Sequence, residues 1–226
     1  LWSISEIPVV RNEVGDLREE VFEAWEFVKT QPWLFAGILM FMIWHVGDSA
    51  IEIGVPFIIG NKGLGANAFG VFGAVGALGA MAGSILGGIR PISKEHRGKV
   101  FYIFIGGIAW CMLMWAMPIP FWAVLVFVLL EGILGGTLGV IWRTTMSDSV
   151  DQHLRGRVNS LDAIGSLIFI PFAPLLGGWM IETTNVLTTY SIAVAFMVLT
   201  TTAGLIVPSF RSFERVESER FPITAD

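Results

Sequence analysis

The sequence predicts an all-α polytopic membrane protein with six transmembrane helices. Hydrophobic residues make up 54% of the 226 residues and charged residues only 15%, whereas soluble domains carry about 25% charged residues. Six stretches are also long and apolar enough to cross a hydrocarbon core of about 30 Å as helices. They cover residues 32–60, 66–89, 100–117, 121–142, 158–181 and 186–207.

The distribution of basic residues supports this span count and predicts the orientation of the chain. With six spans both termini lie on one side of the membrane, and all of the 14 basic residues except Lys62 fall on that side. Because loops rich in lysine and arginine stay in the cytoplasm, we expect both termini of this segment to be cytoplasmic.

Residues 1–31 form a polar stretch before the first span, and we expect a helix within it. Asp16 and Glu19 have the spacing of a capping box, in which two side chains satisfy backbone N–H groups at the start of a helix. Apolar residues then recur at helical spacing, namely Leu17, Val21, Trp25 and Val28. Such an amphipathic helix fits the membrane surface, although an ordinary solvated linker helix has the same pattern.

The first span, residues 32–60, carries ionisable side chains near its middle. His45, Asp48 and Glu52 stand at positions i, i+3 and i+7, which places them on one face of a helix. An ionisable group at that depth costs at least about 2.5 kcal/mol on insertion scales, so it usually faces a polar cavity or a partner rather than lipid. We therefore expect this face to line a water-accessible path.

The span 66–89 is crowded with small residues and is expected to be a packing helix. These residues are Gly70, Gly73, Gly76, Gly79, Ala80, Gly83 and Gly87. Their three- and four-residue spacing lets helix backbones approach closely, as membrane helices require.

Another acidic residue, Glu131, lies at the centre of the span 121–142 and at the same depth as Asp48. Two carboxyl groups at one depth on different helices suggest a shared chamber, in which they take up and release protons as access to water changes. The alternative is a protonated carboxyl group that bonds to a neighbouring helix and has a structural role.

Other side chains of the first span complete the candidate site. Glu52 lies nearer the outer end and is a further candidate for proton coupling or substrate contact. His45 is expected either to exchange protons with Asp48 or to pack as an ordinary histidine. Trp44 and Phe57 could line the cavity and contact an aromatic or cationic substrate, with core packing or lipid contact as the alternative.

The sequence gives no support to an enzyme or a nucleic-acid-binding protein. His45, His96 and His153 are scattered, Cys111 is the single cysteine, and no metal-ligand set such as HExxH or paired CxxC occurs. A basic surface for nucleic acid is also lacking. We therefore expect no catalysis, no cofactor, no metal and no nucleic-acid partner.

Several short motifs lie in the linker, near the cytoplasmic ends of the predicted spans and within the fifth span. They are EAW at residues 23–25, QPW at 31–33, WRT at 142–144, LRGRVNSLD at 154–162 and PLLGG at 174–178. With these motifs the chain resembles the carboxy-terminal half of a major facilitator superfamily transporter, in the branch of bacterial drug and siderophore exporters that includes enterobactin-exporter-like proteins. Ser147 and Asp151 depart from the pattern of that branch, in which Gln and Pro are frequent at these positions.

The resemblance implies half of a twelve-helix fold in the bacterial cytoplasmic (inner) membrane, with substrate bound between two six-helix halves. Residues 1–31 would then be a cytoplasmic interdomain linker, residues 32–208 the transmembrane bundle and residues 209–226 a cytoplasmic tail. The spans that carry Asp48 and Glu131 would be the seventh and tenth helices, both of which line the cavity.

The resemblance also implies a cytoplasmic loop latch made of Arg155, Gly156 and Arg157. These residues would hold helix ends together through carboxylates and helix C-terminal dipoles. Asp162, in the following helix, is the expected partner of this loop.

The expected function is secondary active transport by alternating access, with proton-coupled antiport of drugs or small amphipathic molecules out of the cell. The expected partners are the lipid bilayer, an N-terminal six-helix half not contained in this sequence, protons and a small-molecule substrate. The alternative is a six-helix binding or regulatory membrane protein that acts as a dimer and transports nothing.

Overall fold

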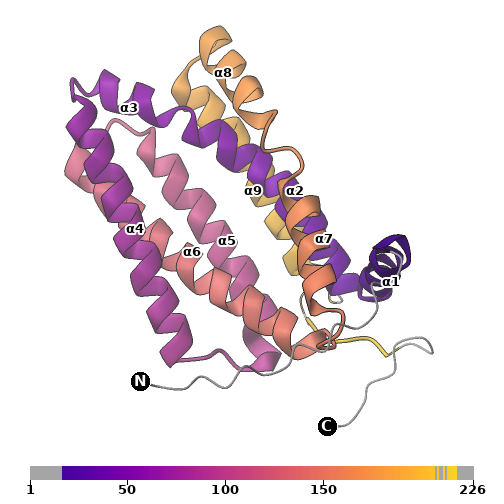
Figure 1. The fold of residues 1–226 in the computed structure, drawn as a ribbon. Helices are drawn as coiled ribbons and strands as arrows, with labels where there is room; N and C mark the ends of the chain where they lie inside the picture. The colour runs from indigo at the N-terminus through magenta and orange to yellow at the C-terminus, as the bar shows by residue number, and fades with distance from the viewer. Residues whose placement is uncertain (1–16, 207, 209–210, 212, 218–226) are drawn as a thin grey trace, which may run out of the picture.

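The computed structural model of the chain describes residues 17–206, 208, 211 and 213–217. Within this part the chain forms nine helices (Figure 1). They are α1 (Leu17–Thr30), α2 (Pro32–Glu52), α3 (Val55–Asn61), α4 (Ala66–Ile89), α5 (Lys94–Trp115), α6 (Phe121–Ser149), α7 (Arg155–Leu167), α8 (Ala173–Thr183) and α9 (Val186–Ile206). Asp16 of the predicted capping box lies outside the described residues.

The chain is an all-α polytopic membrane protein. Five helical segments among the described residues are long and apolar enough to cross a membrane. They are Pro32–Asn61, Ala66–Ile89, Lys94–Trp115, Phe121–Ser149 and Val186–Ile206. The sixth predicted span, residues 158–181, is divided between α7 and α8, and the count of six spans stays a prediction.

Two prolines explain where the broken segments break. A proline has no N–H for the carbonyl group four residues before it, and its ring crowds that carbonyl. The helix α2 ends at Glu52, four residues before Pro56, and α7 ends at Leu167, four residues before Pro171. At the first break the Tyr190 hydroxyl of α9 donates a hydrogen bond of 2.5 Å to the carbonyl oxygen of Ile51.

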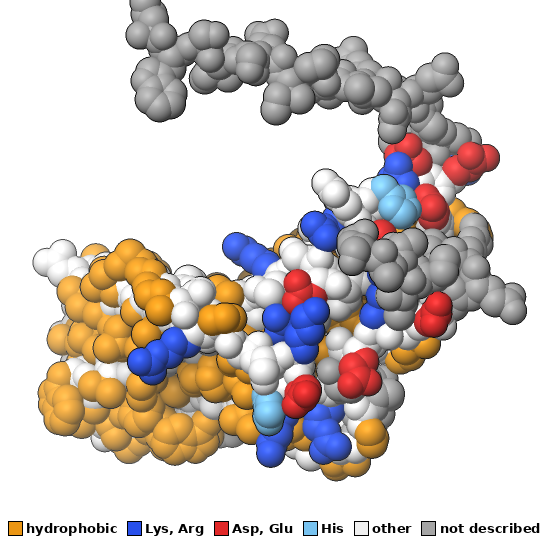
Figure 2. All heavy atoms as spheres, turned by 90° about the horizontal axis from the view of Figure 1, so that it is seen from below, with side chains coloured by type: hydrophobic (Ala, Val, Ile, Leu, Met, Phe, Trp, Pro, Cys, Tyr) orange, Lys and Arg blue, Asp and Glu red, His pale blue; other side chains and the backbone are white. Residues whose placement is uncertain are grey.

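Two helices extend further than the apolar stretches that predict them. The helix α5 begins at Lys94 instead of residue 100, and α6 continues past residue 142 to Ser149. Apart from Glu131 in the middle of α6, the charged residues of these two helices therefore lie on ends that project beyond the apolar spans. Figure 2 shows this end of the bundle, where basic and acidic side chains gather while hydrophobic side chains cover the neighbouring flank.

The helices pack in a continuous series. The helix α4 lies against α6, α6 against α5, α5 against α9, and α9 against α2, with α7 and α8 on the far side of α2. In this order α5 and α9 lie between α2 and α6 (Figure 1). Side chains connect α2 and α6 directly, since the Trp142 ring of α6 packs against Trp33 and Phe41 of α2.

Glycines allow α4 and α6 to pack with their backbones in contact. A methyl group added at Gly83 of α4 would overlap the carbonyl group of Ile133, and one added at Gly136 of α6 would overlap that of Ala80. The close approach lets the Thr137 hydroxyl donate a hydrogen bond of 2.9 Å to the Gly83 carbonyl oxygen of the other helix. This arrangement agrees with the glycine-based packing expected for membrane helices.

Replacement of Gly83 by alanine should separate α4 from α6 and lower the free energy of unfolding by about 1–3 kcal/mol, the usual range for overpacking. Gly88→Ala, on the same helix, is the matched control because nothing lies within 4 Å of a methyl group at that position. Thermal unfolding in detergent measures the midpoint of each purified variant. Equal midpoints for the two variants would contradict the packing explanation.

Candidate functional site

The structure brings three acidic side chains of the membrane region together. Asp48 and Glu52 lie on α2 and Glu131 lies on α6. The charges of Glu52 and Glu131 both act on Asp48, and the charge of Glu52 also acts on Glu131. Asp48 and Glu131 are half-buried, while Glu52 is exposed. We call these three residues the acidic group.

No described residue pairs with the acidic group. Within the described part of the chain, no hydrogen-bond donor and no cation contacts any of the three carboxyl groups. Like charges that act on one another repel, and the repulsion is stronger where burial excludes water, as at Asp48 and Glu131. The group can therefore be neutralised by protons, or by a cation that comes from outside the described residues.

Three other candidate residues of the first span take different positions. Nδ1 of His45 lies 2.7 Å from the carbonyl oxygen of Phe41, and the imidazole acts electrostatically on Asp162 of α7. Trp44 is buried in the hydrophobic core, in agreement with the packing alternative for this residue. Phe57 lies on α3 and is 47% exposed.

Trp142 is the centre of an aromatic cluster at the end of the bundle where α2 begins and α6 ends. Its ring lies 5.1 Å from that of Phe41, 5.9 Å from Trp33 and 5.6 Å from Phe101, measured between centroids. Phe213 of the tail adds a ring at 6.1 Å. The cluster therefore joins α2, α5, α6 and the tail, and we call it the aromatic cluster.

Asp162 bonds to this cluster instead of to the expected loop latch. The Trp142 indole N–H donates a hydrogen bond of 2.9 Å to Asp162 Oδ2, and the Ser166 hydroxyl donates one of 3.3 Å to Oδ1. The expected pairing of Asp162 with the loop arginines is wrong. The reason is geometric: Arg155 and Arg157 lie in the first turn of α7 and point to other helices.

The two loop arginines make contacts of different kinds. Arg157 forms ion pairs of 3.1 Å with both Glu20 and Glu23, and so ties α7 to α1. Arg155 donates hydrogen bonds to the carbonyl oxygens of Ser147 and Val150, at 2.7 and 3.1 Å, which satisfies acceptors at the C-terminal end of α6.

Gly156 is exposed, and nothing lies within 4 Å of the place of a side chain there. Within the described residues, no contact requires a glycine at this position.

The tail docks against the start of α2, a contact that sequence reasoning missed. The buried side chain of Gln31 pairs with the backbone of Val216: its Nε2 donates to the Val216 oxygen at 2.7 Å, and its Oε1 accepts from the Val216 nitrogen at 2.8 Å. Arg215 donates two hydrogen bonds, of 2.8 and 2.9 Å, to Asp151. The one signal in the sequence was the unusual acidic residue at position 151.

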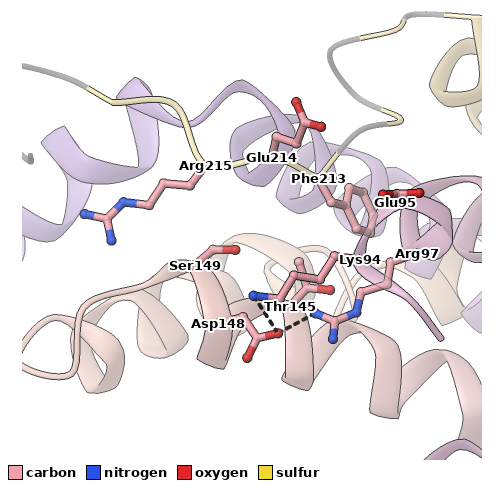
Figure 3. A pocket seen from close by; sticks show the side chains of 9 residues that line it. All are labelled: Lys94, Glu95, Arg97, Thr145, Asp148, Ser149, Phe213, Glu214 and Arg215. Carbon is pink, nitrogen blue, oxygen red and sulfur yellow. Dashed lines mark hydrogen bonds and ion pairs between the residues drawn. The ribbon is translucent and has the colours of Figure 1, made fainter. Parts of the chain in front are cut away.

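A cavity of about 440 Å³ lies beneath the docked tail. Figure 3 shows Lys94 and Arg97 of α5 directed toward Asp148 of α6, with Phe213 on the other side. Arg97 donates a hydrogen bond of 2.6 Å to Asp148, and Lys94 lies 3.9 Å from it. The lining holds equal numbers of acidic and basic side chains, so the cavity favours neither anions nor cations.

Within the described residues, no group of His, Cys, Asp or Glu side chains is placed to hold a metal ion.

The Asp151–Arg215 pair makes docking of the tail dependent on pH. The hydrogen bonds from Arg215 hold the pKa of Asp151 below its ordinary value, which is about 3.9. A lowered pKa in the folded state contributes stability above the ordinary value and loses it as the pH falls through the lowered one. Docking should therefore stay constant from about pH 5 to pH 8 and weaken below about pH 4.

Asp151→Asn should weaken docking at neutral pH by about 1 kcal/mol, which is about a fivefold faster hydrogen exchange of the tail amides. Hydrogen exchange of the tail amides, measured by mass spectrometry and corrected for intrinsic rates, tests the pH dependence of docking and the effect of Asp151→Asn. Gln152→Ala, at the exposed neighbouring position, is the control. Tail protection that is unchanged in Asp151→Asn would show that the ion pair does not hold the tail.

Comparison of the chain with protein-family models matched residues 4–165 to the family described as Major Facilitator Superfamily. The comparisons with curated proteins and with solved structures found no match.

Proposed function

Because the chain belongs to the major facilitator superfamily, a family of secondary membrane transporters, we propose that it is the carboxy-terminal half of a proton-coupled exporter of drugs or other small amphipathic molecules. Substrate would bind between this half and a preceding six-helix half, and the two would rock to expose it to either side of the membrane. The motifs around Trp142, Asp162 and residues 174–178 support placement in the bacterial drug and siderophore exporter branch.

The observation that carries this proposal is the acidic group of Asp48, Glu52 and Glu131. Carboxyl groups without protein partners in a membrane span are functional by default, because burying them has a cost that packing does not offset. Two helices contribute to the group, so a relative movement of α2 and α6 would change both its exposure to water and the repulsion within it.

This coupling would work through protonation of the acidic group. When water reaches the group from the side of higher proton concentration, protonation removes the repulsion between Asp48 and its neighbours. When the cavity opens to the other side, the group releases its protons and can bind a positively charged or polar substrate in their place. A single set of carboxyl groups would thus exchange protons for substrate.

The surroundings of the group supply the wall of the proposed cavity. Phe57 is exposed on α3 beyond Glu52, where it could contact an apolar part of the substrate. His45 Nδ1 lies beside the Phe41 carbonyl oxygen of its own helix, and the imidazole acts electrostatically on Asp162. We therefore assign His45 to an electrostatic connection between α2 and α7 instead of to proton transfer with Asp48.

The proposed location is the bacterial inner membrane, with both ends of this segment in the cytoplasm. The basic residues support this orientation, since all of them except Lys62 fall on one side of the predicted spans. The match to a transporter family weighs against the alternative of a regulatory dimer that transports nothing.

The first test of the function is efflux from bacteria that express the full-length gene in a drug-sensitive host. A panel of fluorescent cations is loaded into the cells, and efflux is followed with and without a protonophore. Efflux that stops when the proton gradient collapses is the expected result. Efflux that survives the protonophore would overturn proton coupling, and failure to export any member of the panel would overturn the proposed substrate class.

Asp48→Asn should abolish uphill transport and leave exchange of substrate down its own gradient, because asparagine resembles a protonated carboxyl group that never releases its proton. Proteoliposomes containing the full-length protein, with an imposed pH gradient, measure both activities. Glu182→Gln is the control, since Glu182 is exposed and lies at the end of α8. Uphill transport by Asp48→Asn at the rate of the control would remove Asp48 from the proposed mechanism.

Arg157→Ala should slow turnover several-fold without changing substrate affinity, because it releases α1 from α7 and so loosens one of the contacts that keep the cytoplasmic ends in register. Arg143→Ala removes an exposed arginine of α6 and is the control. Turnover and affinity come from the concentration dependence of transport in the same vesicles. A change in affinity alone would speak against a role in conformational movement.

A further inference from the structure

The helix α1 presents two apolar faces, and only one of them packs against the protein. Ala24, Phe27 and Val28 are fully buried against the rest of the chain. Val21, Phe22 and Trp25 are exposed to 52%, 56% and 41%. The sequence pattern groups Val21, Trp25 and Val28 on one side, but in the structure Val28 belongs to the buried face. The exposed residues therefore need an explanation of their own.

The exposed face is an apolar stripe with a basic residue at each end. Arg18, Trp25 and Lys29 stand at positions i, i+7 and i+11, so all three lie along one side of the helix. Val21 and Phe22 fill the positions between them. We call these five residues the α1 stripe.

The acidic residues of α1 lie off this stripe, and Glu19 is exposed on another side of the helix. Glu20 and Glu23 form the ion pairs with Arg157 described above. Glu26 pairs with Lys29 from beside the stripe. The stripe itself carries no acidic residue. Its apolar side chains between two cations match the surface of a phospholipid leaflet, which offers hydrocarbon below a layer of phosphates.

The α1 stripe is continuous with the exposed apolar surface of the first span. The Trp25 ring lies edge-on to that of Phe35 at 6.2 Å between centroids. Phe35 is itself 37% exposed, and Leu39, one turn further along α2, is 39% exposed. The apolar surface thus runs without interruption from α1 onto the helix that enters the membrane, and α1 lies across the end of that helix (Figure 1).

We propose that α1 lies in the interface of the cytoplasmic leaflet, with Val21, Phe22 and Trp25 in the lipid and with Arg18 and Lys29 at the level of the headgroup phosphates. Tryptophan favours this level because its ring is apolar and its N–H is polar. The long side chains of arginine and lysine can lie along the apolar surface while their charges reach the phosphates. The helix then anchors the start of α2 to the membrane surface and is more than a connection between domains.

Spin-label accessibility in the full-length protein tests this proposal. Single cysteines at Val21→Cys and Glu19→Cys, in a protein otherwise free of cysteine, are labelled with a nitroxide and reconstituted into phosphatidylcholine–phosphatidylglycerol vesicles. The two positions are two residues apart and so lie on nearly opposite sides of the helix. Both are exposed, so neither label should disturb the fold, which size-exclusion chromatography confirms.

Oxygen concentrates in lipid and a charged nickel chelate stays in water, so the ratio of their collision rates reports immersion. We expect the ratio at Val21→Cys to exceed that at Glu19→Cys several-fold. A ratio that favours the nickel chelate at both positions would place α1 in water and overturn the proposal. Low accessibility of Val21→Cys to both reagents would show that protein covers the stripe, and preference for oxygen at both positions would contradict a one-sided contact with lipid.

Discussion

The position of the Trp142 indole ring determines how the end of the bundle that holds the aromatic cluster is arranged. The ring occupies space that exists because residue 37 is a glycine, since a methyl group there would collide with it. Its N–H has an acceptor in Asp162, which matters because an unsatisfied donor in a low-dielectric interior is costly. One side chain therefore sets the distance between α2 and α6 by its size and the position of α7 by its hydrogen bond. The acidic group depends on that spacing, because Asp48 lies about three turns from Gly37 on α2 and Glu131 about three turns from Trp142 on α6.

Much of the fold follows from the sequence, because length and apolar composition determine which segments can lie in a membrane. The ends of the helices were harder to predict. Arg143 and Lys94 look like loop residues because they are charged, yet a helix leaving the bilayer keeps its backbone hydrogen bonds whatever its side chains are. The proline breaks are different, since Pro56 and Pro171 mark in the sequence the residues where α2 and α7 have to end.

The candidate site was predictable only within single helices. The spacing of Asp48 and Glu52 places them on one face, but the approach of Glu131 depends on how α5 and α9 pack between their helices, which no local pattern records. The partner of Asp162 was misassigned for the same reason. The contact between Gln31 and Val216 gives no signal at all, because one side of it is backbone and the two residues are 185 positions apart.

The docked tail has a consequence for the order in which the protein is made. Phe213 is the last ring of the aromatic cluster to leave the ribosome, long after Trp33 has entered the membrane with α2. Until then the cluster lacks one of its members, and the Gln31 amide has no backbone partner. The earlier helices can insert one by one, but the end of the bundle that holds the aromatic cluster closes only in a late, long-range step of high contact order. Ribosome stalling upstream of position 213 would thus leave a nascent chain with its spans inserted and its aromatic cluster incomplete.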